Sequence, residues 1–196
     1  MTDFSDDDDD FFKNNTKKKK KHISLLLPHW GFGLGVAPTT IEVKSKTASY
    51  TLKSTNFVVK VSYDKPLKKK LSLLLGGSLL PISGSQVDST LGVAKFEANY
   101  TALEASLRMN LLGSPIQGLW LGGGASYLFI GKGSSNVVSA SSITSRFVTQ
   151  INVGYNAEMG SEYLMFRFDY YIHPNALSAA GSVAIAQTVL SASYFY

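Results

Sequence analysis

Three things are scarce in this chain of 196 residues: cysteine, charge and long apolar runs. It has no cysteine, which excludes disulfides, thiolate metal sites and cysteine nucleophiles. Charged residues make up only 17%, against roughly 25% in soluble domains. No apolar stretch approaches the ~18 residues of a membrane helix. A membrane protein of this composition would therefore have to be a closed β-barrel, because lipid tolerates only helices and closed sheets.

Two further absences concern partners and export. The net charge is +5, but the basic residues are scattered outside one short run, so we expect no nucleic-acid partner. No apolar export signal follows Met1, which is succeeded by acidic residues instead. Because an exported barrel needs such a signal, we expect that it has been removed.

Residues 1–21 are of low complexity, with aspartates at 6–10 and lysines at 17–21. Blocks of like charge repel one another and bury nothing, so we predict a disordered tail. The aspartates could bind a divalent cation, and the lysines could lie against anionic lipid head groups. A solvated tail is favoured over both, and we expect no metal site and no cofactor.

The stretch 164–172 alternates between two faces, as the side chains of an extended strand do. Its second face carries one charge of each sign, Arg167 and Asp169. Its first face is entirely apolar or aromatic: Leu164, Phe166, Phe168, Tyr170 and Ile172. A strand with one apolar face and one confined polar face is typical of a transmembrane barrel with a polar lumen.

The same alternation recurs along the chain and predicts eight strands. They cover residues 28–36, 57–63, 71–80, 93–111, 118–130, 146–155, 164–172 and 183–196. A helix competes for 103–111, which is rich in Ala, Leu, Glu and Met, but period two explains its polar positions better. Between 30 and 36, three glycines on one face (Gly31, Gly33 and Gly35) leave space for larger side chains from elsewhere.

The connections between these strands alternate in length. Longer loops are expected near 37–54, 81–92, 131–142 and 173–182, and shorter turns near 64–69, 113–117 and 157–161. This alternation is typical of bacterial outer-membrane barrels, whose long loops and tight turns lie on opposite sides of the bilayer. Part of the 37–54 link could extend its hairpin beyond the membrane.

The composition of the polar face indicates whether lipid or water surrounds the barrel. A water-facing surface, as in a soluble lipocalin-like binder, would be crowded with Lys, Glu and Thr, whereas here Gly, Ser, Ala and Asn dominate. The few charges suit an enclosed lumen filled by its own side chains. We predict a polar network there: Lys60, Glu104, Arg108, Arg146, Arg167 and Asp169. Glu104 and Arg108 lie about 13 Å apart along one strand, so each should pair with an opposite charge on a neighbouring strand.

Aromatic residues are expected near the tight-turn ends of the strands, like the girdle at a membrane interface. They are Trp30, Tyr63, Tyr155, Tyr194 and Tyr196. The predicted fold is all-β: an eight-stranded antiparallel up-and-down transmembrane β-barrel over residues 22–196.

On its strand pattern, loop alternation and aromatic final residue, the chain resembles the small outer-membrane proteins of the OmpA-domain, OmpX and OmpW type. The resemblance implies a monomer in the lipid of the bacterial outer membrane, with tight turns and termini in the periplasm. It also implies a plugged lumen, a structural or surface-contact role, and recognition of the terminal strand by the barrel-assembly machinery. OmpW-like barrels imply an alternative, passage of small or hydrophobic solutes, which apolar lumen positions would favour: Leu74, Leu80, Val148 and Val183.

An enzymatic role is weighed on one stretch, His173-Pro174-Asn175. It resembles the His-x-Ser-Asn stretch of the outer-membrane lipid A deacylases, whose nucleophilic serine would fall at Asn175. The last strand also lacks the expected acidic partner, since residues 181–196 contain no Asp or Glu. Without nucleophile and orienting acid the triad fails, so we expect no catalytic residues.

Overall fold

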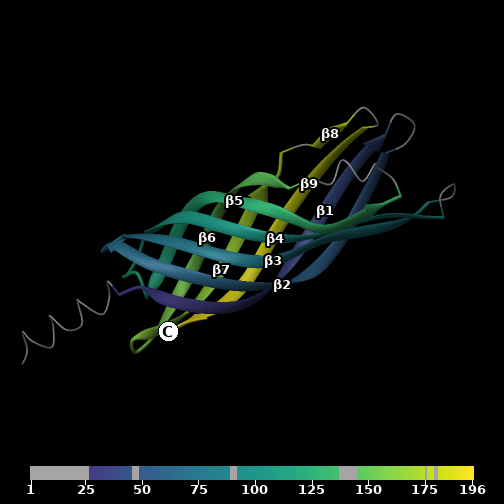
Figure 1. Cartoon of the computed structure of the whole chain (residues 1–196). Coiled ribbons are helices and arrows are strands. Elements are labelled where there is room, and N and C mark those ends of the chain that lie inside the picture. The colour runs from purple at the N-terminus through teal and green to yellow at the C-terminus, as the bar shows by residue number, and fades with distance from the viewer. Residues whose placement is uncertain (1–26, 46–48, 89–91, 137–144, 175, 179–180) are drawn as a thin grey trace, which may run out of the picture.

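A single ring of antiparallel strands makes up the computed structural model, which describes residues 27–45, 49–88, 92–136, 145–174, 176–178 and 181–196. The predicted tail of residues 1–21 lies outside these residues. The strands are β1 (His29–Ser45), β2 (Ser49–Lys68), β3 (Leu71–Asp88), β4 (Gly92–Asn110), β5 (Gly118–Ser135), β6 (Arg146–Met159), β7 (Glu162–Ile172), β8 (Ala176–Ser178) and β9 (Gly181–Phe195). Each long strand pairs with the next, and β1 pairs with β9 to close the barrel (Figure 1).

Eight of the nine strands are the staves of the barrel, which confirms the predicted eight-stranded architecture. The ninth, β8, has three residues and pairs only with the start of β9, where Ala176 lies opposite Val183. It lies at the end of the barrel away from the carboxyl terminus (Figure 1). The segment 103–111, for which a helix competed, is extended up to Asn110 within β4. Among the described residues, no helix is long and apolar enough to cross a membrane.

The predicted loops 37–54 and 81–92 are wrong in extent, because the strands continue through most of both. β1 reaches Ser45 and β2 begins at Ser49, while β3 reaches Asp88 and β4 begins at Gly92. Most outward side chains here are polar, which suggested loops, although Val87 is an apolar exception. Inward side chains such as Ile41 and Leu52 remain apolar and fully buried, and they hold the extended hairpins together.

Pro38 interrupts this extension only locally. Its missing N–H removes one donor from the ladder. The pairing of β1 with β9 accordingly passes from Val36 directly to Thr39, whereas the pairing with β2 is continuous and places Pro38 opposite Thr55. A proline in a barrel strand is thus accommodated where one of the two ladders is broken.

Inward and outward side chains alternate along every stave of the barrel. Outward apolar side chains are largely exposed, as at Leu34 (70%), Phe57 (83%) and Phe147 (70%). Together with the other exposed apolar and aromatic side chains of the eight staves, except Val87 and Val93 near the tip of the β3–β4 hairpin, they form a band around the barrel, which we call the apolar belt. Along β1 the belt ends near Val36, and beyond it Glu42 and Lys44 face outward.

Inward glycines provide space for side chains of neighbouring strands, as predicted for β1. A Cβ on Gly31 would lie 2.7 Å from the ring of Phe195, and a Cβ on Gly33 would lie 1.9 Å from the hydroxyl of Ser193. These separations are below ordinary contact, so the positions require glycine in this packing.

Gly124 and Gly123 offer a matched test of this requirement. A Cβ on inward Gly124 would lie 2.0 Å from the backbone oxygen of Ala105, whereas a Cβ on outward Gly123 would meet only the Gln150 oxygen at 3.6 Å. We expect Gly124→Ala to lower the free energy of unfolding by about 1–3 kcal/mol, because overpacking forces the backbone apart. Gly123→Ala should change it by less than about 0.5 kcal/mol. Urea unfolding in lipid vesicles measures both, and equal effects would contradict the packing.

Candidate functional site

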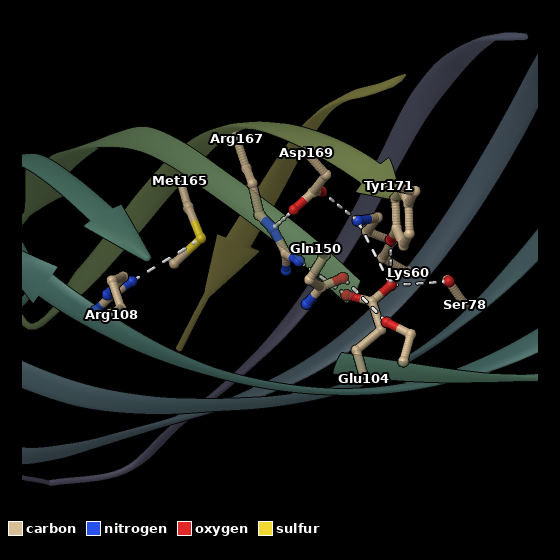
Figure 2. Close-up of polar contacts among 10 residues, drawn as sticks. Lys60, Ser78, Glu104, Arg108, Gln150, Met165, Arg167, Asp169 and Tyr171 are labelled. Carbon is tan, nitrogen blue, oxygen red and sulfur yellow. Dashed lines mark hydrogen bonds and ion pairs between the residues drawn. The ribbon is translucent and has the colours of Figure 1, made fainter. Parts of the chain in front are cut away.

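The middle of the barrel interior holds four charged side chains in a closed ring, shown in Figure 2. Lys60 Nζ lies 2.7 Å from Asp169 Oδ2 and 3.6 Å from Glu104 Oε1. Arg167 completes the ring, with Nη2 2.9 Å from Glu104 Oε2 and Nε 2.5 Å from Asp169 Oδ1. Two positive and two negative charges balance. We call these four residues the charge ring.

The charge ring is almost completely removed from solvent, since its side chains expose between 0 and 4% of their surface. Such burial is tolerable because the charges are paired and their remaining lone pairs are satisfied. Glu104 Oε1 accepts hydrogen bonds from Tyr171 OH and Ser78 Oγ, each at 3.0 Å (Figure 2). The ring is therefore a rigid, neutral group rather than a set of free charges.

A second ion pair lies nearer the tight-turn end. Arg108 Nη2 is 2.6 Å from Asp64 Oδ2, and neither side chain has any accessible surface. Asp64 also accepts a hydrogen bond from Tyr163 OH. The Arg108 guanidinium lies over the Trp120 ring, 5.2 Å from its centroid, where the negative face of the ring favours a cation.

Arg108 also holds the β4–β5 turn in the barrel mouth. Its Nη2 donates to the Pro115 carbonyl at 3.0 Å, and Asn156 Nδ2 donates to the same oxygen at 2.6 Å. The next residue, Ile116, is only 3% exposed and packs with Trp120 and Phe195. The turn therefore folds inward and forms a floor across the tight-turn end.

The outer half of the interior is apolar. Inward side chains from all eight staves pack into one cluster, and most have no accessible surface. Its leucine, isoleucine and aromatic members are Ile41, Tyr50, Leu52, Leu80, Ile82, Phe96, Tyr100, Leu128, Tyr171 and Ile185. This apolar cluster lies on the side of the charge ring away from the floor, since it includes the inward side chains of the extended hairpins.

Arg146 and His173 lie beside the apolar cluster. Arg146 Nη2 donates to Tyr100 OH at 3.0 Å, and its guanidinium lies 5.8 Å from the Tyr100 ring centroid. His173 Nε2 is 3.3 Å from Gln187 Oε1, just beyond the end of β7. Burial, and then the charge of Arg146, lower the pKa of His173 to about 4. His173 is therefore uncharged at neutral pH.

Six interior residues were predicted as one network, and the structure distributes them over three sites. Lys60, Glu104, Arg167 and Asp169 share the charge ring, whereas Arg108 pairs separately with Asp64. Arg146 makes no ion pair within the described part of the chain; its partner is the Tyr100 hydroxyl.

The expectation of pairing between neighbouring strands is wrong for the contacts of β4. Glu104 and Arg108 lie on β4, which is flanked by β3 and β5, yet they pair with residues on β2 and β7. These contacts cross the lumen instead of following the sheet.

Sequence reasoning missed Asp64, which was assigned to a turn with Lys65 and Pro66. β2 in fact continues to Lys68, so Asp64 faces inward. A usable signal was present, because Lys60, Ser62 and Asp64 follow the period of two. Tyr163 and Tyr171, the hydroxyl donors to Asp64 and Glu104, carried no signal beyond their inward position.

Several solved structures share this architecture. OprG from Pseudomonas aeruginosa is 10% identical, with 86% of this chain and 95% of OprG covered and a TM-score of 0.53. AlkL, solved in lipid bilayers, is 14% identical over 86% of this chain and 90% of its own, with a TM-score of 0.52. Ail of Yersinia pestis is 15% identical over 86% of this chain and 98% of Ail, at a TM-score of 0.44. The fold is that of a small outer-membrane β-barrel. No protein-family model and no curated protein matches the sequence.

The five aromatic residues predicted for the girdle of this barrel lie on its outer face. Trp30, Tyr155, Tyr194 and Tyr196 expose between 40% and 56% of their surface, and Tyr63 is partly exposed. Trp30 and Tyr63 are in contact, with ring centroids 5.0 Å apart, and Tyr196 stacks on Phe32 at 6.3 Å. Because the backbone of Trp30 bonds to that of Tyr196, these rings share one end of the barrel.

Proposed function

We propose that this chain is an integral protein of the bacterial outer membrane, with a closed lumen and a role in membrane architecture or surface contact. The observation that carries the proposal is the filling of the interior. Charged groups at Asp64, Arg108 and Asp169 and apolar groups at Leu80 and Leu128 all have 0% accessible surface. No water-sized space adjoins them, so a hydrated ion would have to displace packed side chains.

The exposed surface supports the membrane placement in this proposal. The apolar belt is interrupted by few polar groups, and the girdle aromatics lie at its tight-turn end, where amphipathic rings suit a membrane–water interface. In this proposal the tight turns and the carboxyl terminus lie on the periplasmic side. The terminal Tyr196, 56% exposed, would remain available to the barrel-assembly machinery, and we expect a monomer.

A surface role would fall to the extended hairpins. Residues 38–45 of β1 continue past the apolar belt, a distance of about 26 Å along an extended strand. Their partners on β2 to β4 extend similarly. The outward faces there carry Glu42, Lys44 and Lys53, while the apolar cluster stiffens the inside. The result is a rigid, polar collar suited to contacts with other molecules.

A second candidate, passage of small hydrophobic solutes, is favoured by the apolar outer half. Leu80, Val148 and Val183 do line the interior there, as the alternative requires. Passage would still need the charge ring and the floor to move, because both span the barrel.

Measurements of ion conductance distinguish a barrel with a closed lumen from one that passes solutes. In planar bilayers, the refolded protein is expected to show no stable single-channel current. Arg108→Ala should not create a selective pore, because the charge ring and the apolar cluster remain in place. Robust wild-type conductance whose ion selectivity changes in Arg108→Ala would contradict a closed lumen. Entry of a hydrophobic dye into vesicles only when the protein is present would favour passage of solutes instead.

A further inference from the structure

The outer surface of β1 to β4 carries an apolar groove at the tight-turn end of the apolar belt. Its volume is about 730 Å³, within the ~300–1,000 Å³ range of small-molecule sites. The groove exists because Gly77 lies between two larger side chains, with Val61 opposite it on β2 and Leu103 opposite it on β4. A Cβ on Gly77 would meet no atom closer than 3.8 Å.

Aromatic rings form the wall of this groove toward the membrane interface. Trp30 and Tyr63 pack against each other there, and Leu75 continues the wall on β3. Trp30 is 53% and Leu103 is 55% exposed, so the groove is open to the surroundings of the barrel. In a bilayer, such an apolar, open groove would hold an acyl chain.

Four lysines follow the groove toward the β2–β3 turn: Lys65, Lys68, Lys69 and Lys70. Lys65 is two residues beyond Tyr63 on the same face, which is about 7 Å along the strand. All four are exposed, and none makes an ion pair with a described residue. Asp64, the adjacent carboxylate, faces inward and pairs with Arg108.

Among the described residues, exposed lysines at the tight-turn end lie only on this side of the barrel. The other hairpin turn of comparable length, β6–β7, is flanked by Glu158 and Glu162, and the β4–β5 turn carries no charged residue. A second outer groove, about 440 Å³ and lined by Leu190 and Ala192 among others, has no neighbouring lysines on β9. Positive charge and the larger groove therefore coincide only at β2–β3 among the described turns.

We propose that this groove and the four lysines form a binding site for an anionic phospholipid of the periplasmic leaflet. One acyl chain lies over Gly77 between Val61 and Leu103, and the phosphate lies among the lysines. Long lysine side chains reach the head-group level while their stems remain on apolar surface. The inference rests on the membrane placement proposed above.

Trp30 reports directly on this site, because Trp120, the other tryptophan, is buried inside the barrel. The protein is refolded into phosphatidylcholine vesicles containing a minor, equal fraction of either brominated phosphatidylglycerol or brominated phosphatidylcholine. Bromine quenches tryptophan fluorescence on contact. We expect an association of phosphatidylglycerol with Trp30 about fivefold stronger than that of phosphatidylcholine, from lysine–phosphate attraction near the surface.

Two variants and one control test whether the lysines and the groove each contribute to the preference for phosphatidylglycerol. Replacing the four lysines by glutamine (K65Q/K68Q/K69Q/K70Q) should equalise the two lipids while quenching by phosphatidylcholine remains. Gly77→Leu should weaken the preference by filling the groove. Ala192→Leu, which fills the second groove, should leave it unchanged. A gel-mobility shift on boiling verifies that each variant has folded.

The failures of the two proposals are distinguishable. Equal quenching by both lipids in the wild type, or a preference that survives the loss of all four lysines, overturns the lipid site and leaves the membrane placement intact. Absence of quenching by either lipid in a monomer overturns the membrane placement as well. Absence of quenching together with a dimer mass in native mass spectrometry assigns the groove to a second copy and overturns the lipid site.

Discussion

Replacing Asp169 with alanine is expected to lower the free energy of unfolding by about 3–5 kcal/mol, the range for breaking a buried ion pair. Asp169 balances both Lys60 and Arg167 within the charge ring, at 2.7 and 2.5 Å. Without it, two cations share the single carboxylate of Glu104. The barrel interior then holds an uncompensated positive charge in a region that water does not reach.

A double-mutant cycle in urea, with the protein in lipid vesicles, tests this account. Lys60→Met combined with Asp169→Ala restores neutrality and leaves the Arg167–Glu104 pair intact. We therefore expect the double variant to be more stable than Asp169→Ala alone, with a coupling energy of about 1–3 kcal/mol. Thr101→Ala, on the outer face of β4, is a control expected to change stability by less than about 0.5 kcal/mol. Additive effects of the two interior substitutions would contradict an interacting ring.

Replacing Arg108 with alanine is expected to be comparably destabilising, by about 3–5 kcal/mol, because it leaves Asp64 buried without a counterion. It should also have a local consequence that Asp169→Ala lacks. The Pro115 carbonyl loses one of its two side-chain donors, so that Asn156 alone still donates a side-chain hydrogen bond to it. We expect the turn, residues 111–117, to open more often.

Limited proteolysis measures that opening. A nonspecific protease added to the folded protein in detergent should cut Arg108→Ala within residues 111–117 at a concentration that leaves the wild type intact. Ser72→Ala is the matched control, since it removes only a 3.4 Å hydrogen bond to the same guanidinium. Cleavage of Ser72→Ala at the same rate, or none in Arg108→Ala, would show that Arg108 does not hold the turn.

In the collar, the sequence pattern led to a wrong prediction of where the first strand ends. Polar residues and Pro38 suggested that the strand beginning near residue 28 ends at Val36, yet β1 continues to Ser45. Beyond the apolar belt the outward side chains of β1 meet water, so they are of the polar types that are typical of loops. Only the inner face still carries the strand signal, through Ile41 and Val43.

The sequence by itself determined the barrel and its two faces. Alternation is local, because a side chain's face depends only on its position along its own strand. Eight two-faced strands joined antiparallel leave few ways to bury their polar faces without a helix, and Lys60, Glu104, Arg167 and Asp169 all point inward as predicted.

Only the tertiary structure decided which interior groups meet. That choice depends on the stagger of the strands around the closed ring, which brings together positions on strands that are not neighbours. Glu104 on β4 therefore pairs with Arg167 on β7, Arg108 pairs with Asp64 instead of joining the charge ring, and Arg146 binds the Tyr100 hydroxyl. A pattern with a period of two fixes the face of each residue but contains no information about its height relative to a strand across the lumen.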